Sequence, residues 1–177
     1  MSLEPTNATQ NNNKAETAIR LIDSYGVDTI ICTDGSCAEG TMNGGSAALI
    51  TTGSARNPVI LEELTKKGAK YTSSYDEERA AMFLALEWIR DNNASTDTII
   101  CSDSQSLLTA ITNNSRDTED IRTLLASFKG KIVLHWVPSH VNIPGNEMAD
   151  RAAKGIAVMN SETNDIAVSY NAAKALI

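Results

Sequence analysis

The 177-residue chain has few cysteines, prolines and aromatic residues, and no long apolar run. Three cysteines without the spacing of metal ligands argue against a disulfide scaffold or a cysteine-rich zinc site, and for a reducing compartment. No segment approaches the roughly 20 apolar residues that a membrane helix needs, so we expect no membrane partner. Because no basic-then-apolar leader opens the chain, we expect an intracellular protein, in the cytoplasm or nucleus, that is not secreted.

Basic charge is also scarce. The 15 lysines and arginines stand against 22 acidic residues, which gives a formal net charge of -7. This balance argues against a protein that binds nucleic acid tightly on its own, because affinity for the phosphate backbone comes mainly from Lys and Arg. The acidic charge balance is nevertheless compatible with an enzyme whose carboxylates hold cations that contact a phosphate. With 42% hydrophobic residues the chain can bury a core, and its length suits one domain with tails.

Composition and pattern divide the chain into three parts. Residues 1–24 are a polar tail, of which the first 13 residues are expected to be disordered and the remainder could form a short helix. Residues 25–157 form the expected folded domain. Residues 158–177 form a C-terminal extension, in which 165–176 could be helical.

The hydrophobic pattern of the folded part predicts an α/β domain with a mixed sheet. An early run of strand, turn, strand, turn and strand predicts antiparallel hairpins, whereas later strands followed by helices predict parallel neighbours. The expected elements are strands at 28–34, 46–53, 57–64, 97–103 and 131–137, a Gly-rich turn at 35–45, and helices at 74–91, 104–112, 118–128 and 144–157.

Two of these strands carry nearly the same sequence. Asp28–Asp34 reads DTIICTD and Asp97–Asp103 reads DTIICSD, so six of seven positions are identical. Burial between two layers explains the apolar part of such a strand, but it does not explain an aspartate at the same place in each. If the strands pair in register, Asp34 and Asp103 lie side by side and repel each other unless a proton or a cation lies between them.

The same register has a consequence for the cysteines. A step of two residues returns to the same face of a strand, so Cys32 and Cys101 should be neighbours beneath the two aspartates. We expect both to be free thiols in a reducing compartment. Cys37, in the Gly-rich turn, is expected to be the more reactive thiol.

Further acidic positions could join the aspartate pair. The long helix opens with three acids, and periodicity alone does not choose between Glu77 and Glu78 as the one aligned with the apolar face. The alternative is that these acids serve only the helix dipole. Asp150 lies two turns into the last helix among alanines, where a surface ion pair with Lys154 is the alternative. His140 stands in the loop before that helix, where most histidines are merely solvated.

Four blocks follow one another along the chain. They are Asp34-Gly35-Ser36, Glu78 in an Ala-Leu helix, Ser102-Asp103-Ser104-Gln105-Ser106, and Trp136-Val137-Pro138-Ser139-His140 running on to Gly145-Asn146-Glu147-Met148-Ala149-Asp150. Together they resemble the type 1 ribonuclease H family, and most of all the domains attached to reverse transcriptases of non-LTR retrotransposons. The last block is the most specific one. The resemblance covers roughly residues 28–157 and selects Glu78 over Glu77.

The resemblance implies a ribonuclease H-like fold, with a five-stranded mixed sheet of order 3-2-1-4-5 and helices on both faces. It implies an endonuclease that hydrolyses the RNA strand of RNA–DNA hybrids by a two-metal-ion mechanism and leaves 5′-phosphate and 3′-hydroxyl ends. The expected partners are the hybrid and a reverse transcriptase, fused or separate, and we expect a monomer. The alternative is a non-catalytic ribonuclease H-like module attached to a reverse transcriptase.

The family's pattern also implies roles for individual residues. Two Mg²⁺ ions, for which Mn²⁺ can substitute, would be held by Asp34, Glu78, Asp103 and Asp150, whose hard oxygens suit such ions. His140 would help to move protons or to release product. At two positions where the family often uses amide side chains to bind 2′-hydroxyls, this chain has Ser74 and Tyr75. The implied substrate-binding residues are Ser36, Ser74, Tyr75, Ser104 and Gln105.

Overall fold

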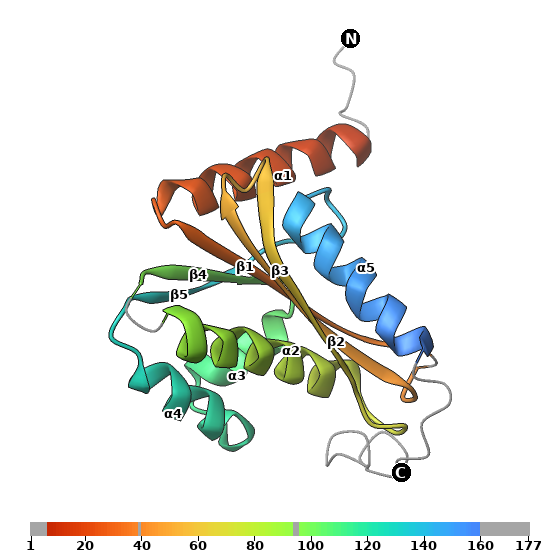
Figure 1. The fold of residues 1–177 in the computed structure, drawn as a ribbon. Helices are drawn as coiled ribbons and strands as arrows, with labels where there is room; N and C mark the ends of the chain where they lie inside the picture. Colours follow the sequence, from red (N-terminus) through yellow and green to blue (C-terminus); the bar gives the residue numbers. More distant parts are fainter. Residues whose placement is uncertain (1–6, 39, 94–95, 160–177) are drawn as a thin grey trace.

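A five-stranded mixed sheet forms the centre of the computed structural model, which describes residues 7–38, 40–93 and 96–159 (Figure 1). The strands stand in the order β3-β2-β1-β4-β5. The first three pair antiparallel, whereas β4 pairs in parallel with both β1 and β5. The strand order implied by the family resemblance is therefore confirmed. The strands are β1 (Thr29–Cys37), β2 (Gly44–Gly53), β3 (Pro58–Lys67), β4 (Thr98–Ser102) and β5 (Ile132–Trp136).

Helices cover both faces of the sheet. On one face lie α1 (Asn7–Ser24) and α5 (Pro144–Met159), and on the other lie α2 (Ser74–Trp88), α3 (Gln105–Thr112) and α4 (Glu119–Ser127) (Figure 1). A π-helical turn at Ile89–Asn93 follows α2, and a 3₁₀ turn at Arg116–Thr118 precedes α4. None of the helices in the described ranges is long and apolar enough to cross a membrane.

The two layers of helices explain why β1 reads as an unbroken apolar run. Ile30 and Cys32 pack in the cluster formed with α1 and α5, whereas Ile31 packs on the other face with Met82 and Leu86 of α2. Each of these side chains is almost fully buried. Alternate residues of the strand therefore serve two separate cores, and no position of the run can be polar without cost.

The repeated sequence pairs with itself in parallel and in register. Cys32 lies opposite Cys101, and the register continues to the position before Asp34 and Asp103. Both thiols are free and buried. A hydrogen bond to Cys32, together with burial, raises the pKa of Cys101 well above its ordinary value. The predicted register and the predicted state of these two thiols are confirmed.

The N-terminal helix is longer than the sequence predicted. It begins at Asn7, so residues 7–13 are helical and not a disordered tail. The apolar stripe that includes Ala18 and Ile22 anchors the helix on the sheet, and once a helix is nucleated each added residue gains a hydrogen bond. The rest of the expected tail, residues 1–6, and the expected helix at 165–176 lie outside the described residues.

Two other boundaries also move. β1 continues to Cys37, through part of the segment predicted as a turn, because Gly35 pairs with Ser46 and Cys37 with Gly44 on the neighbouring strand. Asp34 therefore lies inside a strand, not at its end. Helix α5 runs to Met159, two residues into the expected C-terminal extension.

Gly35 lets α2 approach β1 closely. A Cβ atom at this position would lie 2.1 Å from the backbone nitrogen of Glu78 and 2.3 Å from the carbonyl carbon of Glu77. No side chain fits in that space, so the helix can cross the strand here only because the residue is glycine. The crossing carries Glu78 toward the end of β1.

Replacing Gly35 by alanine should therefore destabilise the domain by about 3 kcal/mol, because helix and strand must move apart. Gly155→Ala is the matched control: its Cβ would meet nothing within 4 Å in the described part of the chain, and the residue lies in helix α5. That variant should gain roughly 0.5 to 1 kcal/mol. Urea unfolding measures both, and equal stability of the two variants would contradict the close crossing.

Candidate metal centre

Three carboxylates from three elements meet at one end of the sheet. Asp34 lies in β1, Asp103 directly follows β4, and Glu78 lies in α2. Each offers one oxygen, and these oxygens all lie within 4.8 Å of one another. Asp34 is 5% exposed and Glu78 is 8% exposed, so both are shielded from water. The predicted contact between Asp34 and Asp103 is confirmed.

The carboxyl groups resist ionisation because they share a poorly solvated space. Burial, followed by the charges of Asp103 and Asp150, raises the pKa of Asp34 from 3.8 to about 8. Burial, followed by Asp34 and Asp103, raises the pKa of Glu78 well above its ordinary value. Burial also raises the pKa of Asp103, although a hydrogen bond from Asn146 opposes this effect. The charged form of such a cluster needs a cation.

The donor set fits a hard divalent cation. Oε2 of Glu78 is buried and has no hydrogen-bond partner among the described residues. Since buried polar atoms normally have a partner, this oxygen is a candidate ligand atom. Carboxylate oxygens suit Mg²⁺ and Mn²⁺, and the three residues that face one another here offer no softer atom.

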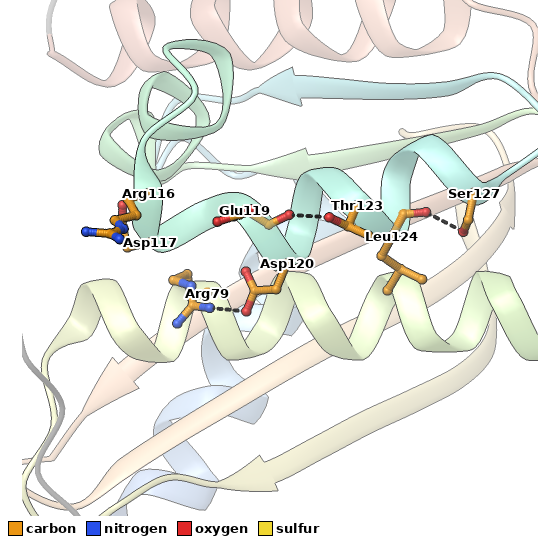
Figure 2. A pocket seen from close by; sticks show the side chains of 8 residues that line it. All are labelled: Arg79, Arg116, Asp117, Glu119, Asp120, Thr123, Leu124 and Ser127. Atoms are coloured by element: carbon orange, nitrogen blue, oxygen red, sulfur yellow. Dashed lines mark hydrogen bonds and ion pairs between the residues drawn. The ribbon is translucent and has the colours of Figure 1, made fainter.

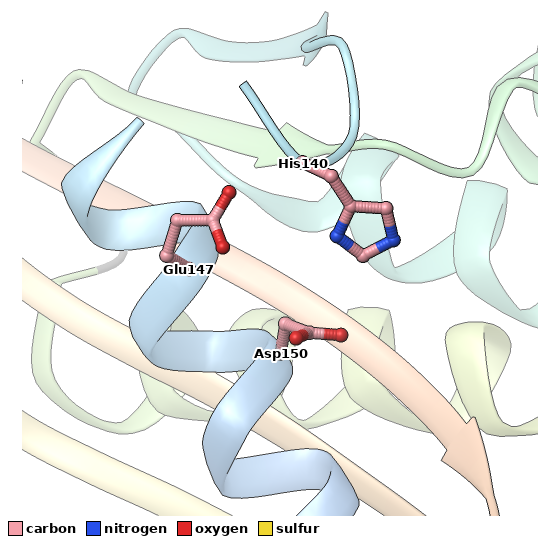
Figure 3. A group of neighbouring side chains, drawn as sticks. All are labelled: His140, Glu147 and Asp150. Atoms are coloured by element: carbon pink, nitrogen blue, oxygen red, sulfur yellow. The ribbon is translucent and has the colours of Figure 1, made fainter. Parts of the chain in front are cut away.

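A second group adjoins the first at the start of α5. His140, Glu147 and Asp150 each offer one atom within 4.8 Å of the others (Figure 3). Lys154 forms an ion pair with Asp150 at 2.7 Å, so the surface pairing that the sequence left open is present. Asp150 nevertheless contributes to the raised pKa of Asp34, so its charge acts on a carboxyl group of the first cluster.

Glu147 is a site residue that sequence reasoning missed. It lies three residues before Asp150, a spacing that places two side chains on the same face of a helix and could have revealed it. Its Oε1 accepts a hydrogen bond from the backbone N–H of Asn142 at 3.2 Å. Asn142 and His140 both have positive φ, at 66° and 55°. Glu147 therefore holds the sharply turned loop that carries His140.

Asn146 is a second residue that was missed. Its Nδ2 donates a hydrogen bond to Oδ2 of Asp103 at 3.4 Å, and the side chain is 2% exposed. Its Oδ1 is buried without a hydrogen-bond partner in the described part of the chain. Asn146 thus links α5 to the end of β4 and orients one of the clustered carboxylates.

The two adjacent glutamates of α2 point to different surroundings. Glu78 faces the carboxylate cluster, whereas Glu77 accepts hydrogen bonds from Oγ of Ser46 at 2.6 Å and from Oγ1 of Thr72 at 2.8 Å. Burial raises the pKa of Glu77, which is 3% exposed. Packing therefore brings Glu78, and not Glu77, to the aspartates, a choice that periodicity left open.

Four of the five residues implied as substrate contacts lie beside the cluster along the chain. Ser36 is half-buried, two residues after Asp34, and Ser74 is exposed at the first residue of α2. Ser104 follows Asp103 and caps α3, where its Oγ accepts a hydrogen bond from a backbone N–H of that helix. Gln105 is exposed at the start of the same helix.

Tyr75, the fifth, is engaged elsewhere. Its hydroxyl donates a hydrogen bond to Oδ2 of Asp117 at 2.6 Å, in the turn before α4. Asp117 lines a surface pocket of about 700 Å³ between α2 and α4, which an ion pair between Arg79 and Asp120 crosses (Figure 2). A contact between the Tyr75 hydroxyl and a 2′-hydroxyl would require this hydrogen bond to break.

Cys37 lies in a strand and not in the turn that the sequence predicted, but it is less buried than Cys32 and Cys101, so its place as the more reactive of the three thiols stays a prediction. The residue lies at the end of β1 and is half-buried. Burial raises its pKa to about 11, although a hydrogen bond with Ser74 opposes the effect. Since the thiolate is the nucleophile, little of the reactive form exists near neutral pH.

Comparison with known proteins associates this arrangement with a family. Residues 27–157 match the family model described as RNase H. A search of curated proteins finds no match. The matched range contains all four predicted carboxylates and excludes helix α1.

Several solved structures share the fold. RNase H1 from the halophilic archaeon Halobacterium salinarum NRC-1 is similar over 74% of this chain and 98% of its own, at 19% identity and a TM-score of 0.60. LC11-RNase H1 in complex with an RNA/DNA hybrid is similar over 72% and 97%, at 17% identity and a TM-score of 0.57. The foamy viral protease-reverse transcriptase in complex with RNA/DNA hybrid is similar over 75% of this chain and 20% of its own, at 16% identity and a TM-score of 0.60.

Without metal, the fold should lose stability as pH rises. The folded-state pKa of Asp34 is about 8 and lies above its ordinary value of 3.8, so between these values the folded state binds more protons than the unfolded state. The stability that Asp34 contributes near its ordinary pKa of 3.8 is lost progressively as the pH rises toward its folded-state pKa of about 8. Melting temperatures in a chelator should therefore fall between pH 5 and about 8, and Mg²⁺ should restore the loss at the upper end.

Two variants test whether Asp34 causes the fall in melting temperature with rising pH, which is the slope in question. Asp34→Asn should flatten it, whereas Asp28→Asn, an exposed aspartate just before β1, should leave it unchanged. A wild-type melting temperature that is independent of pH in chelator, and that Mg²⁺ does not raise, would contradict a crowded and cation-dependent cluster.

Proposed function

The chain belongs to the RNase H family, and on that premise we propose that it is an endonuclease that hydrolyses the RNA strand of RNA–DNA hybrids. The observation that carries the proposal is the cluster of Asp34, Glu78 and Asp103, with Asp150 beside it, inside the matched range. Two structures of similar fold contain RNA/DNA hybrids, which supports a hybrid as the substrate. The catalytic domain would span residues 25–157, with the polar segment 1–24 before it and the extension 158–177 after it.

The cluster is proposed to hold two Mg²⁺ ions, or Mn²⁺ in their place. Asp34, Glu78, Asp103 and Asp150 would hold these ions, with Asp150 serving the attacking water and Glu78 and Asp103 serving the leaving oxygen. When bound, the ions stabilise the attacking and leaving oxygens of the phosphoryl displacement. Attack by water, with the 3′ oxygen as leaving group, yields 5′-phosphate and 3′-hydroxyl ends.

Neighbouring residues prepare the carboxylates for this role. Asn146 donates a hydrogen bond to Asp103, and Lys154 pairs with Asp150, so each side chain is oriented before substrate arrives. His140 is exposed and close to Asp150, on a loop held by Glu147. The proposed role of His140 is to pass a proton to solvent or to help release product.

Substrate contacts are proposed for the residues beside the cluster. Hydroxyl groups of Ser36, Ser74 and Ser104 and the amide of Gln105 can bond sugar and phosphate oxygens. Tyr75 would take part only after release from Asp117. With a net charge of -7, the chain offers little attraction to a polyanion, so a reverse transcriptase, fused or separate, is the proposed source of additional binding. The monomeric state and a non-LTR retrotransposon origin are likewise proposals.

The deciding assay compares three labelled substrates: an RNA–DNA hybrid, duplex DNA and single-stranded RNA, each with Mg²⁺ and with chelator. The proposal expects metal-dependent cleavage of the hybrid alone, with new 5′-phosphate ends. Binding of the hybrid without cleavage would favour a non-catalytic module and overturn the proposal.

Asp34→Asn or Asp103→Asn should lower the cleavage rate by about 1,000-fold or more, because interactions worth several kcal/mol in the transition state are lost. The metal-free melting temperature of either variant should equal or exceed that of the wild type, since one repulsive charge is gone. Asp28→Asn serves as the control with normal activity. A clear metal-free destabilisation in both active-site variants would argue against a crowded site.

His140→Ala should slow turnover by roughly 100-fold and leave measurable cleavage, as expected for a group that assists proton transfer. Steady-state rates at saturating Mg²⁺ and hybrid measure the effect, and circular dichroism checks the fold. A loss as complete as that of Asp34→Asn would show that His140 is a ligand or a structural residue.

A further inference from the structure

A groove at the end of β5 is built partly by α1, the helix outside the range that matches the RNase H family model. It has a volume of about 720 Å³ and lies between α1 and the end of β5. Lys14 and Leu21 come from the helix, and Trp136 and Pro138 come from the end of the strand and the loop after it. The family-matched domain alone therefore does not form this groove.

The lining is apolar and aromatic, with a cation beside it. Leu21 is 50% exposed and Trp136 is 47% exposed, which leaves large apolar surfaces open to a ligand. Burial lowers the pKa of His135, so its imidazole is neutral near pH 7 and adds another flat ring, itself packed edge-on against Tyr25. Lys14 is exposed on the helix side of the groove.

One lining residue, Trp136, connects this groove with a residue of the metal centre. The indole Nε1 of Trp136 donates a hydrogen bond to the backbone carbonyl of Asp103 at 3.2 Å. Trp136 also lines a second, smaller groove of about 300 Å³ together with Gln105 and Thr109 of α3. Trp136 therefore lines both grooves, the one that contains Lys14 and the one that contains Gln105, and it is hydrogen-bonded to the backbone of Asp103.

We propose that the groove binds an unpaired nucleotide of the RNA strand where that strand continues beyond the hybrid. The base would lie on Trp136 between apolar walls, and its phosphate would meet Lys14. Aromatic platforms combined with basic side chains are how proteins hold single-stranded nucleic acid, since every base has a face that can stack. A paired base offers only its edges, so an unpaired nucleotide fits this lining better than duplex.

The proposal deepens the proposed function, on which it rests, by naming a substrate class: hybrids whose RNA strand carries a single-stranded extension. Helix α1 would then act as a specificity element added to the hydrolytic domain. We expect α1 to raise the affinity for hybrids with an RNA extension relative to hybrids whose ends are flush.

Fluorescence tests binding directly. The chain has two tryptophans, and the other, Trp88, donates its Nε1 hydrogen bond to Glu62 on β3, away from the groove. In a Trp88→Phe background, a four-nucleotide single-stranded RNA should quench Trp136 in a saturable way. Lys14→Glu should raise the dissociation constant by about tenfold. Arg20→Glu makes the same charge change on the same helix outside the groove and should have no effect.

Cleavage kinetics test the consequence in otherwise native protein. The ratio of KM for a flush hybrid to KM for a hybrid with a four-nucleotide RNA extension should be about 10 in the wild type and in Arg20→Glu, and about 1 in Lys14→Glu. Cleavage of the flush hybrid with a ratio near 1 in the wild type, and no quenching by RNA, would overturn the groove assignment. Quenching that depends on Lys14, without cleavage of any hybrid, would support the groove and overturn the proposed function instead.

Discussion

The in-register parallel pairing of β1 with β4 is the constraint on which the candidate site depends. It brings Asp34 and Asp103 together at a place where burial disfavours both charges, and where the charge of Asp103 further raises the pKa of Asp34. The apolar residues below them, buried on both faces of the sheet, hold the strands in that register. A one-residue slip of either strand would turn every one of its side chains to the other face. The same register is therefore required for the buried core and for the carboxylate pair.

Glycines complete the site because they let two helices approach the same region of the sheet. Gly35 admits the backbone of α2, and a Cβ at Gly45 would lie 2.5 Å from the carbonyl oxygen of Ala153 in α5. Gly145, at the start of α5, leaves room for the thiol of Cys32. These close approaches bring carboxylates from both faces of the sheet to one end of it, which no single helix or strand could do.

Charge links the stability of the fold to its chemistry. Carboxyl groups that are crowded without a counter-ion cost folding free energy when ionised, and a bound divalent cation turns the same crowding into affinity. Lys154 offsets part of the charge at Asp150, and Asn146 offers a hydrogen bond to Asp103, but neither replaces an ion. The acidity that would repel a nucleic acid backbone elsewhere on the surface is, at this point, the chemistry from which the proposed cation site is built.

The sequence by itself determined the pairing of the repeated strands, the buried thiols and the proximity of Asp34 and Asp103, because two nearly identical strands that pair in register bring equivalent positions side by side. Its motifs also indicated the sheet order and the choice of Glu78. Only the tertiary structure decided that Glu147 supports the His140 loop, that Tyr75 turns to Asp117, and that α1 reaches Trp136 to form a groove. Most of these contacts join side chains tens of residues apart, and their directions depend on how helices pack, which local periodicity does not encode.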